Sequence, residues 1–178
     1  MLYAIPVLST AGTAPPTQNV ATAVNKGFEF GVNYAGGAGS AIRYNIGGNI
    51  TFINNEITNL GTGGEPINSG RIQSANSTVA RTDVGHPLAS FYGYVTDGLF
   101  QTQEEVTSAA FQNENTAPGD IRFRDLNGDN VIDVKDQTYI GNPIPKATYG
   151  LTGDISFMGF DLSMFWQGSQ GNDIYNGS

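Results

Sequence analysis

The stretch "IRYNIGGNITF", residues 42–52, alternates apolar and polar side chains along its whole length. One set of positions holds Ile42, Tyr44, Ile46, Ile50 and Phe52, and the other holds Arg43, Asn45, Gly47, Asn49 and Thr51. A period of two places these sets on opposite faces of a β-strand. The stretch therefore predicts a strand with one apolar and one polar face.

Three further stretches repeat this pattern: "FEFGVNY" (28–34), "YGLTGDISF" (149–157) and "FDLSMFWQ" (160–167). The small residues "AGGAGSA" (35–41) join the first strand to the stretch at 42–52, and a tight turn at Met158-Gly159 joins the last two. Phe165 breaks the otherwise polar row of its strand. We predict an all-β fold of antiparallel strands.

Two environments suit such strands. At about 8–11 residues they would cross a bilayer at a tilt, and aromatic residues lie near their ends, as in the interfacial girdles of membrane barrels. These are Tyr34, Phe52, Tyr149, Phe157, Phe160 and Trp166. A water-soluble sandwich of two sheets also alternates apolar and polar residues. The pattern alone leaves both open, although polar faces almost free of lysine favour a watery lumen.

The composition of the chain limits the classes of function that it can serve. The 178 residues carry a net charge of −8, with 16 acidic and 8 basic residues, and no cysteine. The acidity argues against nucleic acid as a partner, and disulfides and thiolate metal sites are excluded. With His86 as the sole histidine and no evident nucleophile or acid/base pair, the sequence does not indicate an enzyme.

The segment "DLNGDNVIDVKD", residues 125–136, has the spacing of a calcium-binding loop. A twelve-residue loop wraps Ca²⁺ with oxygens from positions 1, 3, 5, 7, 9 and 12. The predicted ligands are Asp125, Asn127, Asp129, Val131 through its carbonyl, Asp133 and Asp136. Asn130 stands where such loops need a left-handed residue, which asparagine tolerates. The alternative is a solvated acidic turn, since these are ordinary turn residues.

The flanks of this loop do not predict helices. Upstream, Ile121 and Phe123 alternate with arginines, which indicates a strand, and downstream Pro143 and Pro145 would stop a helix. We therefore divide the chain into strands and a short turn at 1–53, a long loop region at 54–146 that carries the metal loop, and a hairpin with the start of another loop at 147–178.

Four ordered motifs resemble the barrel half of SusC/RagA-type TonB-dependent transporters of Bacteroidota: "NKGFEFGVNY" (25–34), "GHPLASFYGYVTDGLFQ" (85–101), "PGDIRFRDLNGDNVIDVKDQTYIGNPIPKATYG" (118–150) and "GFDLSMFWQGSQGNDIYN" (159–176). The resemblance implies an incomplete part of a large transmembrane β-barrel in the bacterial outer membrane. The long loop would be extracellular and would carry an EF-hand-like calcium loop with a structural Ca²⁺.

The resemblance also implies partners. These would be a SusD-like lipoprotein, the TonB complex acting through a plug domain that this sequence does not contain, and an oligosaccharide or peptide as the imported substrate. The alternative function is a soluble secreted β-domain whose dockerin-like calcium loop serves adhesion or assembly.

The aromatic cluster Phe91, Tyr92 and Tyr94 lies within the second motif. Its rings could face a sugar substrate. The competing interpretation, which we favour, is that they pack the long loop against the barrel rim, because buried aromatic area dominates such packing.

Overall fold

The computed structural model describes residues 2–4, 12, 17–19, 21–61, 64–72 and 77–176. Its elements are almost all antiparallel strands, so the predicted all-β class is confirmed. The chain divides into two compact units. The first comprises residues 1–67, 82–88 and 142–176, and the second comprises residues 68–81, 89–141 and 177–178.

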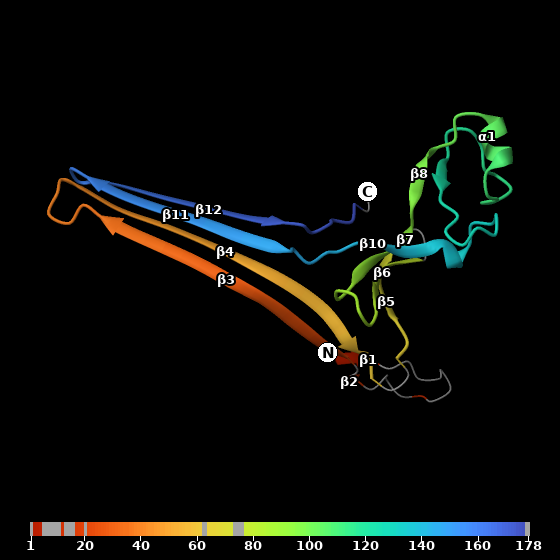
Figure 1. The fold of residues 1–178 in the computed structure, drawn as a ribbon, viewed down its shortest axis with the longest axis horizontal. Helices are drawn as coiled ribbons and strands as arrows, with labels where there is room; N and C mark the ends of the chain where they lie inside the picture. Colours follow the sequence, from red (N-terminus) through yellow and green to blue (C-terminus); the bar gives the residue numbers. More distant parts are fainter. Residues whose placement is uncertain are drawn as a thin grey trace. The chain divides into compact units, whose positions relative to one another are not determined.

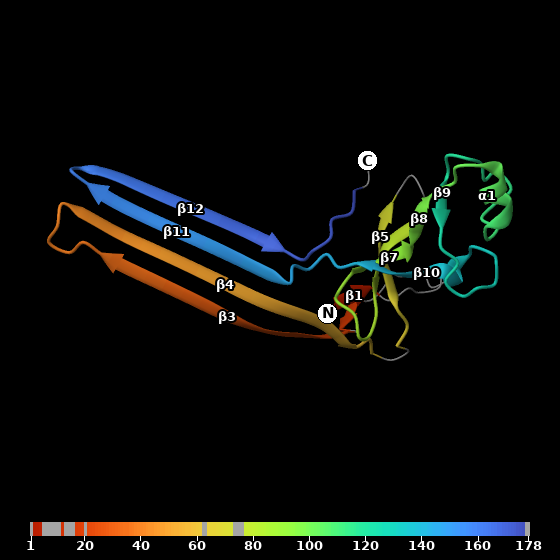
Figure 2. The same cartoon turned by 45° about the horizontal axis from the view of Figure 1, so that its top comes forward.

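A four-stranded antiparallel sheet dominates the first unit (Figure 1). Its strand order is β12-β11-β4-β3, and Figure 2 shows the four strands side by side after rotation. The strands are β3 (Thr22–Gly36), β4 (Ile42–Asn59), β11 (Ala147–Phe157) and β12 (Phe160–Gln170). The unit also contains the short antiparallel pair β1 (Leu2–Ala4) and β2 (Thr17–Asn19). Within the described residues the large sheet is open, with β3 and β12 as its edges.

The register aligns the predicted apolar sets of all four strands on one face of this sheet. One row runs Val32, Gly48, Leu151 and Trp166 from β3 to β12. Because neighbouring rows two residues away share that face, the apolar positions of the four sequence stretches form one continuous surface. The opposite face carries the polar sets and Phe165.

Two strands are longer than predicted. β3 has 15 residues and β4 has 18, against the expected 8–11. In β4 the alternation inverts after Phe52: Asn54 and Glu56 continue the apolar face, while Ile57 lies on the other face and is completely buried. A strand whose apolar face changes sides looks like two patterns in the sequence, which is why the prediction ended at Phe52.

A small core forms where the alternation has inverted. It consists of Ala21, Ile57 and Leu60, with Ile67 and Leu88 packed against it. The segment before Leu88 continues along β4 beyond the end of β11, because the Ile57 N–H donates to the His86 carbonyl at 2.9 Å and the Gly85 N–H to the Ile57 carbonyl at 2.8 Å. His86 therefore contributes backbone pairing, consistent with a structural role.

The second unit holds most of the sheet β10-β7-β6-β5 and the hairpin β8-β9. Their bounds are β5 (Ile67–Ile72), β6 (Ser77–Thr82), β7 (Ser90–Tyr94), β8 (Thr96–Leu99), β9 (Ile121–Phe123) and β10 (Gln137–Gly141). The described residues of the unit also form a short helix, α1 (Gln103–Ser108), and a 3-10 turn, η2 (Val134–Asp136). The predicted strand upstream of the metal loop is β9, and no helix flanks the loop on either side.

None of the helices among the described residues has the length and apolar character to cross a membrane.

Candidate functional site

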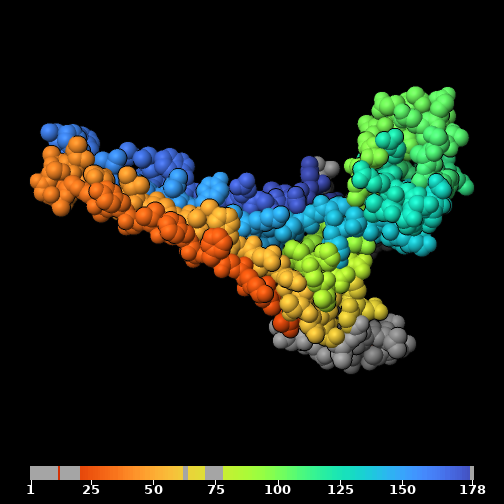
Figure 3. Space-filling model, viewed as in Figure 1, coloured from red at the N-terminus to blue at the C-terminus, as the bar shows by residue number. Residues whose placement is uncertain are grey.

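The apolar face of the large sheet is exposed. The exposed fractions are 67% for Phe28, 62% for Phe30, 58% for Trp166 and 80% for Phe160. Figure 3 shows one side of this sheet in space-filling form, with atoms of its strands at the surface. Scattered exposed apolar residues are normal, but one continuous surface across four strands marks contact with another apolar phase or partner.

The opposite face is polar and carries little charge along its middle. Successive rows read Gly31, Asn49, Gly150 and Gln167, then Asn33, Gly47, Thr152 and Phe165, then Ala35, Asn45, Asp154 and Ser163. The sheet is therefore a single layer with an apolar surface on one side and an amide- and hydroxyl-rich surface on the other. A soluble two-sheet sandwich would bury the apolar side, which this unit leaves exposed.

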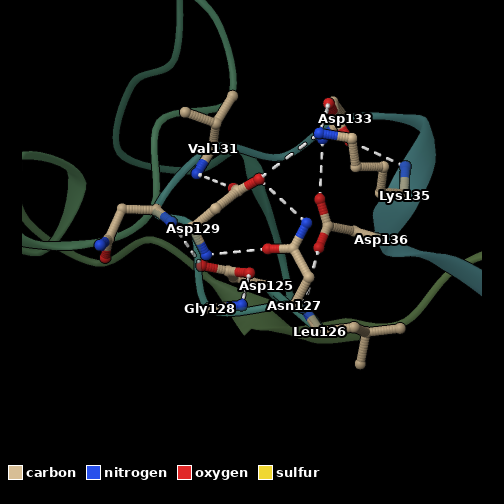
Figure 4. Close-up of polar contacts among 10 residues, drawn as sticks. Asp125, Leu126, Asn127, Gly128, Asp129, Val131, Asp133, Lys135 and Asp136 are labelled. Atoms are coloured by element: carbon tan, nitrogen blue, oxygen red, sulfur yellow. Dashed lines mark hydrogen bonds and ion pairs between the residues drawn. The ribbon is translucent and has the colours of Figure 1, made fainter.

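The metal loop (125–136) is held by hydrogen bonds from its own backbone (Figure 4). The Asp125 carboxylate accepts from Gly128 N–H at 2.6 Å and from Asn130 N–H at 2.8 Å. Asp129 accepts from Val131 N–H at 3.0 Å. Asn130 has φ +63°, so the predicted left-handed residue is confirmed at that position.

Asp136, the predicted closing ligand, is the last residue of the loop and is fully buried. Its carboxylate accepts from the backbone N–H groups of Asp133 (2.8 Å), Leu126 (2.9 Å) and Asn127 (3.4 Å). These bonds, with that from Asp133 first, lower the pKa of Asp136 despite the opposing effect of burial. Asp136 thus ties the start of the loop to its end, and with Asp133 it forms a reciprocal cap on η2.

The donor set fits a hard cation in part. A carboxylate has about four lone-pair sites and an amide oxygen has two. Asp125, Asn127, Asp129 and Asp133 therefore keep acceptor capacity beyond their backbone hydrogen bonds, whereas Asp136 uses most of its own. No three histidine or acidic side chains in the described part of the chain gather closely enough to hold a metal. The Lys135 ammonium lies 4.0 Å from Asp129 and 3.8 Å from Asp133 and partly neutralises them.

The aromatic cluster Phe91, Tyr92 and Tyr94 lies on β7 and is half-buried. The Tyr92 ring meets Tyr139 edge-on, with centroids 5.1 Å apart, and the guanidinium of Arg81 lies over it at 4.6 Å. Tyr94 packs against Phe123 at 5.2 Å. The tyrosine rings therefore contact residues of their own unit, and Phe91 pairs through its backbone with β6 and β10.

A charged clamp in the β8-β9 hairpin was not predicted. The Asp97 carboxylate pairs with Arg124 at 2.9 Å and with Arg122 at 3.6 Å. Arg122 also donates to the Asp97 carbonyl at 3.1 and 2.7 Å. The "RFR" spacing puts both arginines on one side of a strand, but nothing in the sequence indicates that residue 97 lies opposite.

Replacing Asp97 with asparagine is expected to loosen this hairpin above about pH 4. The hydrogen bond from Arg124, followed by its charge and that of Arg122, holds the pKa of Asp97 below its ordinary value of 3.8. A lowered pKa stabilises the fold fully above that ordinary value, and the contribution disappears as pH falls through the lowered pKa. Amide hydrogen exchange of β8 and β9 should be faster in Asp97→Asn than in the parent at pH 6, and the difference should shrink as the pH falls through the lowered pKa of Asp97. Equal exchange at pH 6 would show that the clamp does not hold the hairpin.

The fold defines an all-β protein of antiparallel sheets. We compared the chain with known proteins, and no protein-family model matches its sequence. The chain is 32% identical over 177 residues to the TonB-dependent receptor SusC of Bacteroides thetaiotaomicron, covering 96% of this chain and 16% of that protein. It is 28% identical over 179 residues to TonB-dependent receptor P3 of Formosa agariphila, covering 99% of this chain and 18% of the relative.

Solved structures agree on the fold. The RagAB peptide transporter matches with a TM-score of 0.67 and 18% identity, over 94% of this chain and 17% of that chain. The RagAB peptide importer in its open-open state matches with a TM-score of 0.68, over 97% of this chain and 17% of the other. The resemblance to SusC/RagA-type TonB-dependent receptors is therefore confirmed over nearly the whole chain, which spans less than a fifth of the length of each of these proteins.

Proposed function

We propose that this chain forms part of the wall of an outer-membrane, TonB-dependent transporter that imports nutrients, either glycans or peptides. The observation that carries the proposal is the exposed apolar surface on one side of a single-layered sheet whose other side is polar. Such a sheet suits a wall between lipid and water, because barrel strands in outer membranes alternate apolar-out and polar-in.

The height of the apolar surface supports a membrane setting. In β4 the surface runs from Ile42 to Phe52, which at about 3.4 Å per residue spans roughly 34 Å along the strand. A strand tilted by about 45° would then cover about 24 Å of membrane depth, close to the roughly 25 Å apolar band of outer-membrane barrels. The inversion after Phe52 would mark the point at which β4 leaves the bilayer.

The proposed partners follow from the relatives. SusC and P3 are TonB-dependent receptors, and RagAB is a peptide transporter, also described as a peptide importer. We propose a SusD-like lipoprotein and the TonB complex as partners of this protein, the latter acting through a plug domain. The names of these relatives describe receptors and transporters and support no enzymatic role.

Cell fractionation tests the proposal and separates it from the alternative of a secreted adhesion or assembly domain. The natural protein should be recovered in detergent from the outer membrane, and uptake of its nutrient should stop when TonB is inactivated. Recovery in the aqueous phase would contradict the transporter assignment and favour the secreted domain.

We further propose that the loop at 125–136 closes around a structural Ca²⁺, which would draw together side chains that lie too far apart in this structure to hold it. The ligands would be Asp125, Asn127, Asp129, the Val131 carbonyl, Asp133 and Asp136. A hard cation takes oxygen ligands of this kind. It would relieve repulsion among the acids of the loop, of which Lys135 partly neutralises Asp129 and Asp133. Bound calcium would also restrict the conformations of the long loop region, whose ordering otherwise costs conformational entropy.

The double substitution Asp129→Ala and Asp133→Ala is expected to raise protease sensitivity of residues 100–146. Calcium should protect this segment in the parent, and chelation should remove the protection. Glu114→Ala is the matched control, because Glu114 is an exposed acid of the same segment whose side chain has no partner among the described residues. Identical cleavage of the parent in calcium and in chelator would show that the loop does not use the metal.

A further inference from the structure

One aromatic ring lies on the polar face of the large sheet. Phe165 pairs with Thr152 across the strands, and Ser163 and Gln167 are its neighbours on the same face of β12. Its side chain is 63% exposed. The adjacent Met164 and Trp166 lie on the apolar face, so contact with lipid explains them but does not explain Phe165.

The ring borders a hollow of about 450 Å³ on this face. The residues of the polar face that line the hollow are Asn49, Thr148, Gly150, Phe165, Gln167 and Ser169. The register puts Asn49, Gly150 and Gln167 in one row, with the glycine between the two amides. A Cβ on Gly150 would lie 3.1 Å from Oδ1 of Asn49, so glycine keeps the space between the amides open.

The polar groups around the hollow are free to bind a ligand. The side chains of Asn49, Gln167, Thr148 and Ser169 make no hydrogen bond to any other described residue. The described lining contains no charged side chain. Two amides and two hydroxyls together supply both donors and acceptors, while a charged ligand would find no counter-ion there.

We propose that Phe165, Asn49 and Gln167 form a subsite for a neutral sugar ring. The C–H face of a sugar would stack on the exposed phenyl ring, and its hydroxyls would exchange hydrogen bonds with the two amides. The inference rests on the proposed function, in which this face lines the passage, and it selects an oligosaccharide over a peptide as the cargo that contacts this wall.

Calorimetric binding to the full transporter in detergent tests the subsite. The probes are maltohexaose, xylohexaose and mannohexaose, with a mixture of neutral hexapeptides for comparison. The parent should bind at least one of the three oligosaccharides. Phe165→Ala should weaken that binding about tenfold, as truncation of a central aromatic anchor does, and Phe165→Tyr should retain it because the ring remains.

Two further variants separate ligand contact from folding. Phe160→Ala removes an 80% exposed phenylalanine from the apolar face of the same strand and should leave binding unchanged. Gly150→Ala should weaken binding by filling the hollow. All variants are compared at equal recovery from the outer membrane.

Different outcomes overturn the proposed subsite and the proposed transporter function. Binding of hexapeptides alone, binding of none of the three oligosaccharides, or equal binding by the parent and Phe165→Ala would each overturn the subsite. If the protein is still recovered from the outer membrane, the proposed function survives that result. Absence of the protein from the outer membrane would instead overturn the proposed function.

Discussion

Replacing Val32 with arginine is expected to destabilise the inserted protein by about 2–4 kcal/mol, the cost of a basic side chain at the midplane of a barrel's lipid face. Val32 is 59% exposed and lies in the row with Gly48, Leu151 and Trp166, midway along the apolar surface. The guanidinium would have to enter hydrocarbon without a partner. Titration with urea of the full protein in bilayers measures the free energy of unfolding of the parent and of the variant.

The neighbouring residue provides the control. Asn33 lies on the same strand but on the polar face, so Asn33→Arg should change stability by about 1 kcal/mol or less, because lumen-facing substitutions meet water. A similar loss in both variants would contradict the assignment of the two faces. Unchanged stability of Val32→Arg would also contradict that assignment.

The second large effect is expected at Gly27, opposite Ile53 on β4. A Cβ built on Gly27 would overlap the backbone carbonyl oxygen of Phe52, which cannot rotate away as a side chain could. Gly27→Ala should therefore break the β3-β4 pairing locally and cost about 1–3 kcal/mol, as overpacking typically does. Amide exchange near Phe52 should become faster.

Gly31 offers the matched substitution. It lies on the same strand, and the nearest atoms to its Cβ are the Gly48 carbonyl oxygen at 3.9 Å and the Asn49 Cβ at 4.0 Å. Gly31→Ala should be almost neutral. Equal thermal stability of Gly27→Ala and Gly31→Ala would show that the strands do not approach each other as closely as described.

Alternation predicted the faces of the sheet well, because a period of two is local and needs no knowledge of pairing. It failed where the environment changed along one strand. Ile57 belongs to a core completed by Leu88, about thirty residues away in the chain, and this contact makes the opposite face of β4 the buried one. Ile53 and Ile57 show the inverted pattern in the sequence, but the sequence does not show that it continues the strand of residues 42–52.

The metal loop likewise shows that local spacing in the sequence does not predict contacts between distant residues. Spacing predicted the turn, its strand flank and the left-handed Asn130. It did not predict that the Asp136 carboxylate would be buried under three backbone N–H groups, because that depends on how the ends of the loop meet. The Asp97 clamp was missed because its arginines are 25 and 27 residues away in sequence.

Spin labels on β12 test the central claim most directly. The chain has no cysteine, so single cysteines at residues 160–167 would label one position at a time in the membrane-embedded protein; any cysteines elsewhere in the full protein would be replaced first. The account predicts collisions with oxygen dissolved in lipid at Phe160, Leu162, Met164 and Trp166, and collisions with a water-soluble nickel complex at Asp161, Ser163, Phe165 and Gln167. Loss of this two-residue period, or equal access of the nickel complex to both sets, would contradict a wall between lipid and water.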